Sequence, residues 1–285
     1  MSWQRDESPR NFLTVDVEDY FQVAAFESVV RQAEWKEYES RVEANTDRLL
    51  ALFEQYDVRA TFFVVGWIGE QYPALIRKIR DLGHEIGCHS YLHRRIYDLG
   101  PEEFFRDTKL AKEILEQASG EQVVGYRAPT YTITRKSYWA LEILNELDFT
   151  YDSSIFPIRH DNYGIPDAPR FPYQVEGMDL IEFPISTALI CGRKIPVAGG
   201  GYFRLFPLWF TLRALKRINR VEGKPFVFYV HPWEVDPGQP RFESASRLSR
   251  FRHYTNLDKT MDRLHILLRT FRFQPIRAAA CLGAG

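Results

Sequence analysis

Residues 60–88 read ATFFVVGWIGEQYPALIRKIRDLGHEIGC, and this stretch decides the fold. The apolar run at 60–65 is typical of a strand that is buried on both faces. Pro73 stands where a helix opens, and Gly83 follows Leu82 where that helix ends. Residues 84–88 then form a second short strand. A strand, a helix and a strand in this order predict two parallel strands joined by a helical crossover.

The rest of the chain repeats this alternation. Strands are predicted at residues 12–17, 60–65, 84–88, 123–126, 149–151, 180–183, 226–230 and 273–276. Helices are predicted at residues 45–55, 73–82, 101–118, 134–147, 207–219 and 258–270. Asn45 is the predicted N-cap of the first helix. Seven or eight strands favour a closed α/β barrel over an open doubly wound sheet, and no G-x-G-x-x-G follows the first strand.

Length and composition exclude several classes of protein. The 285 residues fit one large domain or two small ones. Hydrophobic residues make up 45% and charged residues 26%, which excludes disordered, collagen-like and coiled-coil chains. The 37 basic and 38 acidic residues give a net charge of −1, without the basic excess of a nucleic-acid-binding protein.

Three features predict a cytoplasmic protein without stable membrane insertion. Cys88, Cys191 and Cys281 are too few and too far apart for a disulfide framework or a C-x-x-C metal site. The first ten residues are polar and lack the apolar segment of a secretory signal. The longest apolar run, at residues 60–68, is too short to span a bilayer.

Polar side chains gather where the predicted strands end. In barrels of parallel strands, the residues at the carboxyl ends of the strands form the active site. The residues at these ends are Asp16, Glu18, Asp19, His89, His93, Arg127, Asp152 and His231. Their number indicates an enzyme.

Two imidazoles and a group of carboxylates indicate a metal ion. His89 and His93 are four residues apart, so on one helical turn both rings face the same side and can hold one ion. The three carboxylates within residues 16–19 repel one another unless a cation or fixed donors lie nearby. An Asp and two His around Zn²⁺ leave one position open for water, which is the arrangement of a catalytic zinc site.

Five motifs occur in the order found in the NodB-type polysaccharide deacetylases, which the chain resembles from about residue 11 to residue 236. They are T-V-D-V-E-D (14–19), H-S-Y-L-H (89–93), Y-R-A-P-T (126–130), Y-D-S-S (151–154) and F-Y-V-H-P-W-E (228–234). This is carbohydrate esterase family 4, a family of metal-dependent hydrolases. The resemblance implies an α/β fold, a distorted (β/α)7-8 barrel. The first and last motifs resemble most the cytoplasmic members linked to exopolysaccharide biosynthesis loci.

The resemblance also implies roles for single residues. Asp16 resembles the family's catalytic base, which takes a proton from the metal-bound water. His89 and His93 resemble its metal-binding histidines. Arg127 resembles the arginine that pairs with the base, and this ion pair would hold Asp16 ionised. His231 resembles the general acid that protonates the leaving nitrogen. The metal is a divalent ion, Zn²⁺ in the first place, with Co²⁺ or Ni²⁺ as alternatives.

Three further residues are expected to contact the substrate. A backbone N–H near Thr130 resembles the family's oxyanion donor. Tyr131 and Trp233 fall in predicted loops, where an aromatic ring can stack on a sugar ring. The loop at residues 156–178, which is rich in Pro, Gly and Asp, is expected to lie over the site.

The chain departs from the family pattern at the metal-binding carboxylate. The family usually reads T-F-D-D, but Val17 follows Asp16 here. On a continuing strand Glu18 shares a face with Asp16, whereas a turn after Val17 would favour Asp19. Both Glu18 and Asp19 therefore stand as candidate ligands.

A second departure concerns the partner of His231. The family's D-S-x-D segment ends in an Asp that orients the acid histidine, but Ile155 occupies that position here. An alkyl side chain cannot orient an imidazole by a hydrogen bond. Glu234 and Asp236 are the alternatives.

From this resemblance we expect a hydrolase that removes an N-acetyl group from an N-acetylated sugar or polysaccharide precursor. Two alternatives are an allantoinase-like or deformylase-like C–N amide hydrolase on the same fold, and a carbohydrate-binding protein that has lost catalysis. We expect a single domain over residues 1–285, in which residues 237–285 pack on the barrel as a C-terminal extension.

Overall fold

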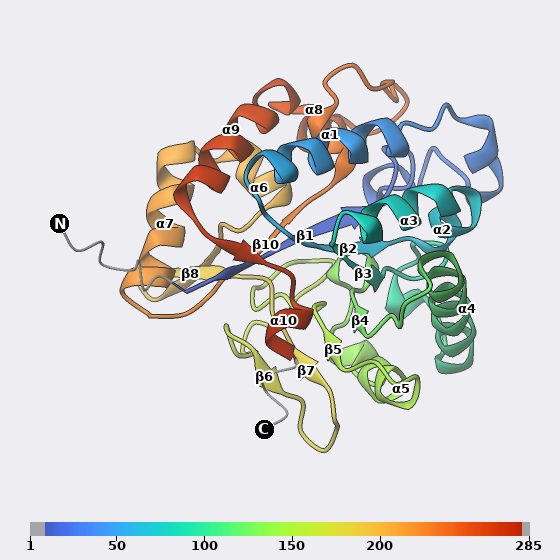
Figure 1. Cartoon of the computed structure of the whole chain (residues 1–285), viewed down its shortest axis with the longest axis horizontal. Coiled ribbons are helices and arrows are strands. Elements are labelled where there is room, and N and C mark those ends of the chain that lie inside the picture. Colours follow the sequence, from blue (N-terminus) through green and yellow to red (C-terminus); the bar gives the residue numbers. More distant parts are fainter. Residues whose placement is uncertain (1–8, 281–285) are drawn as a thin grey trace.

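The computed structural model describes residues 9–280, whose elements surround one curled sheet (Figure 1). The strands are β1 (Asn11–Val17), β2 (Thr61–Val64), β3 (Glu85–Cys88), β4 (Gly125–Tyr126), β5 (Tyr151–Asp152), β6 (Tyr173–Gln174), β7 (Ile181–Glu182), β8 (Thr187–Ile190), β9 (Arg193–Pro196), β10 (Val227–Val230) and β11 (Phe273–Gln274). The helices are α1 (Val42–Gln55), α2 (Gly66–Gln71), α3 (Pro73–Asp81), α4 (Pro101–Ser119), α5 (Ala140–Glu146), α6 (Gly200–Leu205), α7 (Leu208–Arg220), α8 (Arg247–Tyr254), α9 (Leu257–Thr270) and α10 (Arg277–Ala280). Cys281 lies outside the described residues.

The main sheet has the strand order β10-β1-β2-β3-β4-β5-β7-β6, and β11 pairs beside β1. All these pairs are parallel except β6 with β7. Within residues 9–280, β10 and β6 end the path without pairing to each other. The predicted distorted α/β barrel is confirmed, but it curls without closing. Strands of only two residues, from β4 to β6, offer few hydrogen bonds with which to close it.

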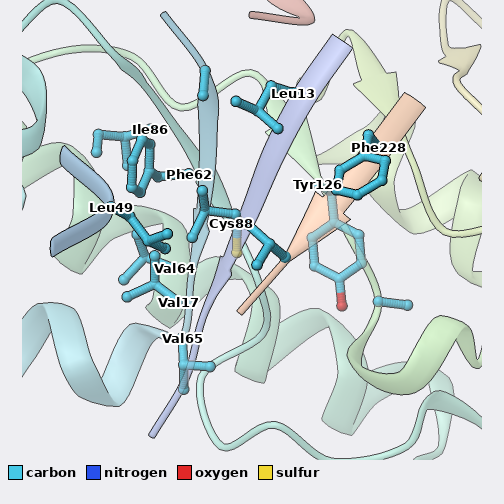
Figure 2. Close-up of a cluster of buried hydrophobic side chains, with 14 of the residues drawn as sticks. Leu13, Val17, Leu49, Phe62, Val64, Val65, Ile86, Cys88, Tyr126 and Phe228 are labelled. Atoms are coloured by element: carbon cyan, nitrogen blue, oxygen red, sulfur yellow. The ribbon is translucent and has the colours of Figure 1, made fainter. Parts of the chain in front are cut away.

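The two faces of β1 pack into two separate cores. Leu13, Val15 and Val17 face the helices, and Figure 2 shows Val17 beside Leu49 of α1. On the other face, Phe12 lies inside the curled sheet with a cluster of aromatic rings. Because successive strand residues point to opposite faces, residues 14 and 16 share the inner face with Phe12. The alternation therefore places Asp16 inside the barrel.

α1 begins at Val42, before the predicted N-cap Asn45. Asn45 lies within α1, and its buried side chain donates a hydrogen bond to Asp236 Oδ2 at 3.3 Å. Asp19 caps the start of α1, because its Oδ2 accepts hydrogen bonds from the backbone N–H groups of Arg41 and Val42 at 2.8 and 3.2 Å. These are donors that a helix leaves unpaired at its start.

Several elements differ from the sequence prediction. The predicted helix at 134–147 is a 3₁₀ turn (Arg135–Ser137) followed by α5. The β8–β9 hairpin and the short helices α2, α6 and α8 were not predicted, since each is too short to show a clear period. No helix among the described residues is long and apolar enough to cross a bilayer.

Candidate active site

Three buried side chains meet at the carboxyl ends of β1 and β3. The ligand atoms of Glu18, His89 and His93 lie within 4.8 Å of one another, and Glu18 Oε2 is 2.7 Å from His93 Nε2. The Nδ1 of His89 is 2.7 Å from the carbonyl oxygen of Arg127, to which it donates. This contact leaves Nε2 of His89 free to ligate. Two imidazoles and one carboxylate are a donor set that fits zinc or a similar divalent ion.

Glu18, His89 and His93 form what we call the metal trio, and the protonation states of His89 and Glu18 suit a cation. Burial lowers the pKa of His89 to about 4, although the charge of Asp16 opposes it, so the ring is neutral at pH 7. Burial raises the pKa of Glu18, but the hydrogen bond and charge of His93 outweigh burial and hold that pKa well below its usual range. A neutral imidazole and an ionised carboxylate are the forms that bind metals.

The two histidines meet in a loop, so the predicted helical turn is wrong. Ser90 and His93 have positive φ values of 63° and 53°, which fold the chain back on itself. Asp107 of α4 holds the loop, because its Oδ2 accepts from Ser90 Oγ and from the backbone N–H of Tyr91, both at 2.8 Å. No local sequence signal pointed to Asp107.

Asp19 does not join the metal trio. Its carboxylate accepts from Ser40 Oγ at 2.7 Å and from the first backbone N–H groups of α1. The backbone N–H of Glu18 donates to the carbonyl oxygen of Asp16 at 3.1 Å, so the chain bends there. Of the two carboxylates that the sequence left open, the structure brings Glu18 to the histidines, and the expectation of Asp19 as a ligand is wrong.

Asp16 and Arg127 form a buried ion pair, with Arg127 Nη1 2.6 Å from Asp16 Oδ1. The same Nη1 donates to Thr14 Oγ1 at 2.7 Å. The other donors of the guanidinium bind Ser153, Nε to its carbonyl oxygen at 3.0 Å and Nη2 to its Oγ at 2.8 Å. The guanidinium also lies 4.3 Å from the ring centroid of Phe63. These contacts fix Arg127 and, through it, Asp16.

His231 faces both carboxylates from β10. Its Nε2 lies 3.9 Å from Asp16 Oδ2 and 3.5 Å from Glu18 Oε1. Its Nδ1 is 2.6 Å from Glu234 Oε1. Burial lowers the pKa of His231, but the hydrogen bond to Glu234 and the charges of Glu18, Glu234 and Asp16 outweigh burial and raise it to about 9. The ring therefore carries two protons at pH 7, as a general acid requires.

Glu234 is thus the carboxylate partner of His231, in the absence of the D-S-x-D aspartate. The other alternative, Asp236, pairs with Arg41 at 3.2 Å and Arg48 at 3.6 Å. Ile155, at the position of the family's aspartate, is fully buried in the core.

Arg204 holds Glu234 in place, a role that no local sequence pattern indicated. Its Nε donates to Glu234 Oε2 at 2.6 Å, and its Nη1 donates to the carbonyl oxygens of His253 and Thr255 at 2.7 and 2.9 Å. The side chain is almost fully buried. Because these partners lie 30 to 51 residues away, only the fold brings them to Arg204.

Trp233 is buried between two histidine rings. It stacks on His231 at 5.0 Å and on His253 at 4.1 Å, and its Nε1 donates to Glu18 Oε1 at 3.1 Å. Both faces of the indole are covered, so in this structure Trp233 offers no open face on which a sugar ring can stack. The indole instead holds Glu18 and His231 in position.

A pocket of about 220 Å³ opens onto these side chains. Its lining includes Asp16, Glu18, His89, His93, Thr130, Tyr131, Tyr163, Arg204, His231, Trp233 and His253. Thr130 has a φ of 54° on the pocket wall. The hydroxyl of Tyr131 donates to Asp16 Oδ2 at 3.3 Å, so this ring braces the carboxylate from the pocket side. Tyr163 comes from the loop at 156–178.

Two family models match adjacent parts of the chain. Residues 35–151 match the model described as "Polysaccharide deacetylase". Over this segment, which is less than half of its length, the chain is similar to the polysaccharide deacetylases. Residues 153–280 match a model described as "Domain of unknown function (DUF3473)".

The chain is also similar to curated proteins over part of its length and to solved structures in its fold. A peptidoglycan-N-acetylglucosamine deacetylase of Bacillus cereus is 31% identical over 98 residues, which are 34% of this chain and 36% of the relative. The chain spans about a third of the length of the first curated relatives it matches. A Mycobacterium smegmatis structure assigned to the polysaccharide deacetylases has a TM-score of 0.62 at 19% identity, over 98% of this chain and 91% of that one. Puue allantoinase has a TM-score of 0.61 at 14% identity, over 98% and 91%. Both structures share the fold.

The pocket combines side chains from both matched segments. His89, His93 and Arg127 lie in the first segment. Arg204 and His231 lie in the second, and both line the same pocket as the metal trio. Asp16 and Glu18 precede the two matched segments. The site is therefore complete only when all three parts of the chain are folded together.

Outside the lining of this pocket, the protein buries two neighbouring carboxyl groups. Asp152 of β5 and Glu182 of β7 are register partners and are fully buried. Asp152 Oδ1 accepts from Ser154 Oγ at 2.5 Å, and Glu182 Oε1 accepts from the backbone N–H of Ile155 at 2.9 Å. Burial raises the pKa of Asp152 to about 6, and burial together with the charge of Asp152 raises the pKa of Glu182 well above its usual value.

We expect Glu182→Gln to flatten the dependence of stability on pH. Glu182 binds a proton in the folded chain at pH values where the unfolded chain has released it, so the free energy of unfolding falls as pH rises above about 4.5. Gln keeps the oxygen that accepts from Ile155 but does not titrate. Chemical denaturation between pH 5 and about 8 measures the effect. Glu222→Gln, at an ion pair with Arg170, is the matched control, and equal slopes for parent and Glu182→Gln would contradict the prediction.

Proposed function

We propose that this protein is a metal-dependent hydrolase that removes the acetyl group from an N-acetylated sugar or polysaccharide precursor. One observation carries the proposal. The metal trio, the Asp16–Arg127 ion pair and the His231–Glu234 pair line or adjoin one pocket. The curated deacetylases that match the chain give the class of substrate.

The metal trio of Glu18, His89 and His93 would hold a divalent cation. Such a cation lowers the pKa of water and polarises a carbonyl oxygen. Trp233 and the carbonyl oxygen of Arg127 orient Glu18 and His89 from behind. These outer contacts fix the direction of the ligand atoms.

Asp16 and His231 are placed for the two proton transfers of amide hydrolysis. Their nearest side-chain atoms are 3.9 Å apart, so a group held beside both meets a carboxylate and a protonated imidazole. Asp16 accepts a proton from the attacking water, and His231 donates one to the amide nitrogen as the C–N bond breaks. This proton is needed because an amine anion is a very poor leaving group. The products are acetate and the free amine of the sugar.

Substrate binding is assigned to the wall formed by residues 130 and 131. A backbone N–H near Thr130 is proposed to bind the oxyanion, which fits the position of Thr130 in the pocket wall. Tyr131 contacts the substrate with its edge while its hydroxyl stays on Asp16.

The test is acetate release from N-acetylglucosamine oligomers by the purified chain. The protein is stripped with a chelator and reloaded with Zn²⁺, Co²⁺ or Ni²⁺, and acetate and free amine are measured together. We expect activity only after reloading, with one acetate for each amine. Allantoin and N-formyl sugars are offered in parallel, because Puue allantoinase shares the fold. Hydrolysis of these compounds alone, or full activity of the stripped protein, would overturn the proposal.

We expect Glu234→Gln to lower kcat by about 10- to 100-fold, because Glu234 orients His231, and general acid catalysis as a whole contributes about 10²- to 10⁴-fold. Glu234 also raises the pKa of His231, so its loss lowers that pKa. The acid is then deprotonated at lower pH, and the alkaline limb of the kcat/KM profile shifts to lower pH. Profiles of parent and variant measure both effects. An unchanged alkaline limb in a folded variant would mean that Glu234 does not act on His231.

Three finer points belong to the same proposal. The metal is Zn²⁺, in keeping with two histidines and one carboxylate. The substrate is a precursor of an exopolysaccharide, and the protein acts on it in the cytoplasm. The chain works as one catalytic domain over residues 1–285, in which residues 237–285 pack on the barrel, and the pairing of β11 with β1 supports this. Metal analysis, cell fractionation and truncation before residue 237 test the three points.

A further inference from the structure

An apolar pocket of about 880 Å³ lies between α7 and the β8–β9 hairpin, with a lining separate from that of the active-site pocket. Its apolar lining includes Leu189, Ile190, Trp209, Phe210, Leu212 and Val221. Trp209 and Val221 expose 68% and 67% of their surface, and Leu189 exposes 40%. A large patch of exposed apolar side chains is typical of a surface that binds a partner.

The same surface is strongly basic. Arg213, Lys216, Arg217 and Arg220 of α7 are exposed and line the pocket. Spacings of three and four residues place Trp209, Arg213, Lys216 and Arg220 on one face of the helix. α7 contains no acidic residue, and none of its four exposed cations forms an ion pair or hydrogen bond with a side chain among residues 9–280. These charges are free to meet an anionic partner.

A row of aromatic rings leads from this surface to the active site. Trp209 contacts Phe210, Phe210 contacts Phe206, and Phe206 contacts Tyr202, with ring centroids 5.3–6.1 Å apart. Tyr202 belongs to α6, whose Gly201 and Arg204 line the active-site pocket. Figure 1 shows α6 and α7 as neighbours on one side of the molecule. A partner bound along α7 therefore lies next to α6, the helix that contributes to the wall of the active-site pocket.

We propose that α7 and the β8–β9 hairpin, the basic apolar face, bind the surface of an anionic lipid bilayer. An indole and aliphatic side chains bordered by arginines match the apolar edge and the anionic headgroups of such a surface. A nucleic acid would pair its phosphates with the cations but would leave the aliphatic pocket between them without a partner. The binding is peripheral, because no described helix can span a bilayer. The inference does not depend on the proposed reaction.

The test is co-sedimentation of the full chain with phosphatidylcholine vesicles, with and without phosphatidylglycerol. We expect binding only to the vesicles that contain phosphatidylglycerol, and weaker binding as salt is raised. The Arg213→Glu/Arg217→Glu variant is expected to bind at least about tenfold more weakly. The matched control reverses two exposed charges on α4, Arg106→Glu/Lys109→Glu, and should bind like the parent. Hydrolysis of a soluble substrate should be unchanged in both variants.

A second measurement reports on the apolar half of the face. Brominated phospholipids quench a tryptophan that enters the headgroup region. We expect quenching in the parent protein and its loss in Trp209→Phe, because the other tryptophans of residues 9–280 do not line this pocket. Three results would overturn the proposal: equal binding to neutral and anionic vesicles, unchanged binding of the folded Arg213→Glu/Arg217→Glu variant, or duplex RNA displacing the protein from the vesicles. Concentration-dependent dimerisation that Trp209→Ala abolishes would assign the face to a second copy instead.

Discussion

The His93→Ala protein is expected to bind Zn²⁺ at least about 100-fold more weakly than the parent and to release no measurable acetate. Loss of a contact behind a metal ligand already costs about 10- to 100-fold in affinity, and loss of the ligand itself costs more. His93 lies 2.7 Å from Glu18 and is one of the three side chains of the metal trio, so the substitution removes one of three ligands. Competition with a chromophoric chelator gives the affinity, and metal analysis after dialysis gives the stoichiometry.

His265→Ala is the control for this experiment. His265 lies on α9, where its Nδ1 is 2.9 Å from the hydroxyl of Tyr56, and it does not line the pocket. It should keep the parent's metal affinity and activity. A folded His93→Ala protein that still holds one ion per chain at the parent's affinity would remove His93 from the ligand set.

Asp16→Asn is expected to lower kcat by about 10³-fold while metal binding is kept. Asn cannot accept the proton that the reaction gives to Asp16, but the metal trio is intact because Asp16 is not part of it. The substitution also leaves the buried charge of Arg127 without its partner, which costs roughly 3–5 kcal/mol of stability. Activity is therefore compared at a temperature where circular dichroism shows that the variant is folded, and metal content is measured on the same samples.

Asp47→Asn is the matched control, since Asp47 pairs with Lys78 on the surface at 2.6 Å and lies outside the pocket. It should leave kcat and metal content unchanged. An Asp16→Asn protein that binds metal and keeps activity within about tenfold of the parent would show that another group accepts the proton.

The sequence predicted the parts of the site that local patterns specify. The apolar run at 12–17 predicted a strand with Asp16 and Glu18 at its carboxyl end, and β1 places them there. The pairing of His89 and His93 was also predicted, although the turn that joins them was not. Their loop takes its shape from two residues with positive φ and from Asp107 of α4, and a spacing of four residues contains neither piece of information.

The remainder depended on contacts between distant parts of the chain. The choice between Glu18 and Asp19 was open in the sequence because it depends on the first turn of α1, where Asp19 binds the backbone of Arg41 and Val42. Arg204 could not be predicted as the partner of Glu234, since the two belong to different elements. Trp233 was predicted to stack on a sugar ring because the sequence does not show that His253 covers the indole. That contact follows from the packing of the C-terminal helices.

The His231–Glu234 pair lies within a single 3₁₀ turn, Pro232–Val235 and its N-cap. In the family pattern described above, the carboxylate partner of the histidine belongs to the D-S-x-D segment, far from the histidine in the sequence. Here the proton donor and its counter-charge move together as one rigid piece. A change in the spacing between β5 and β10 would therefore leave the contact between His231 and Glu234 in place.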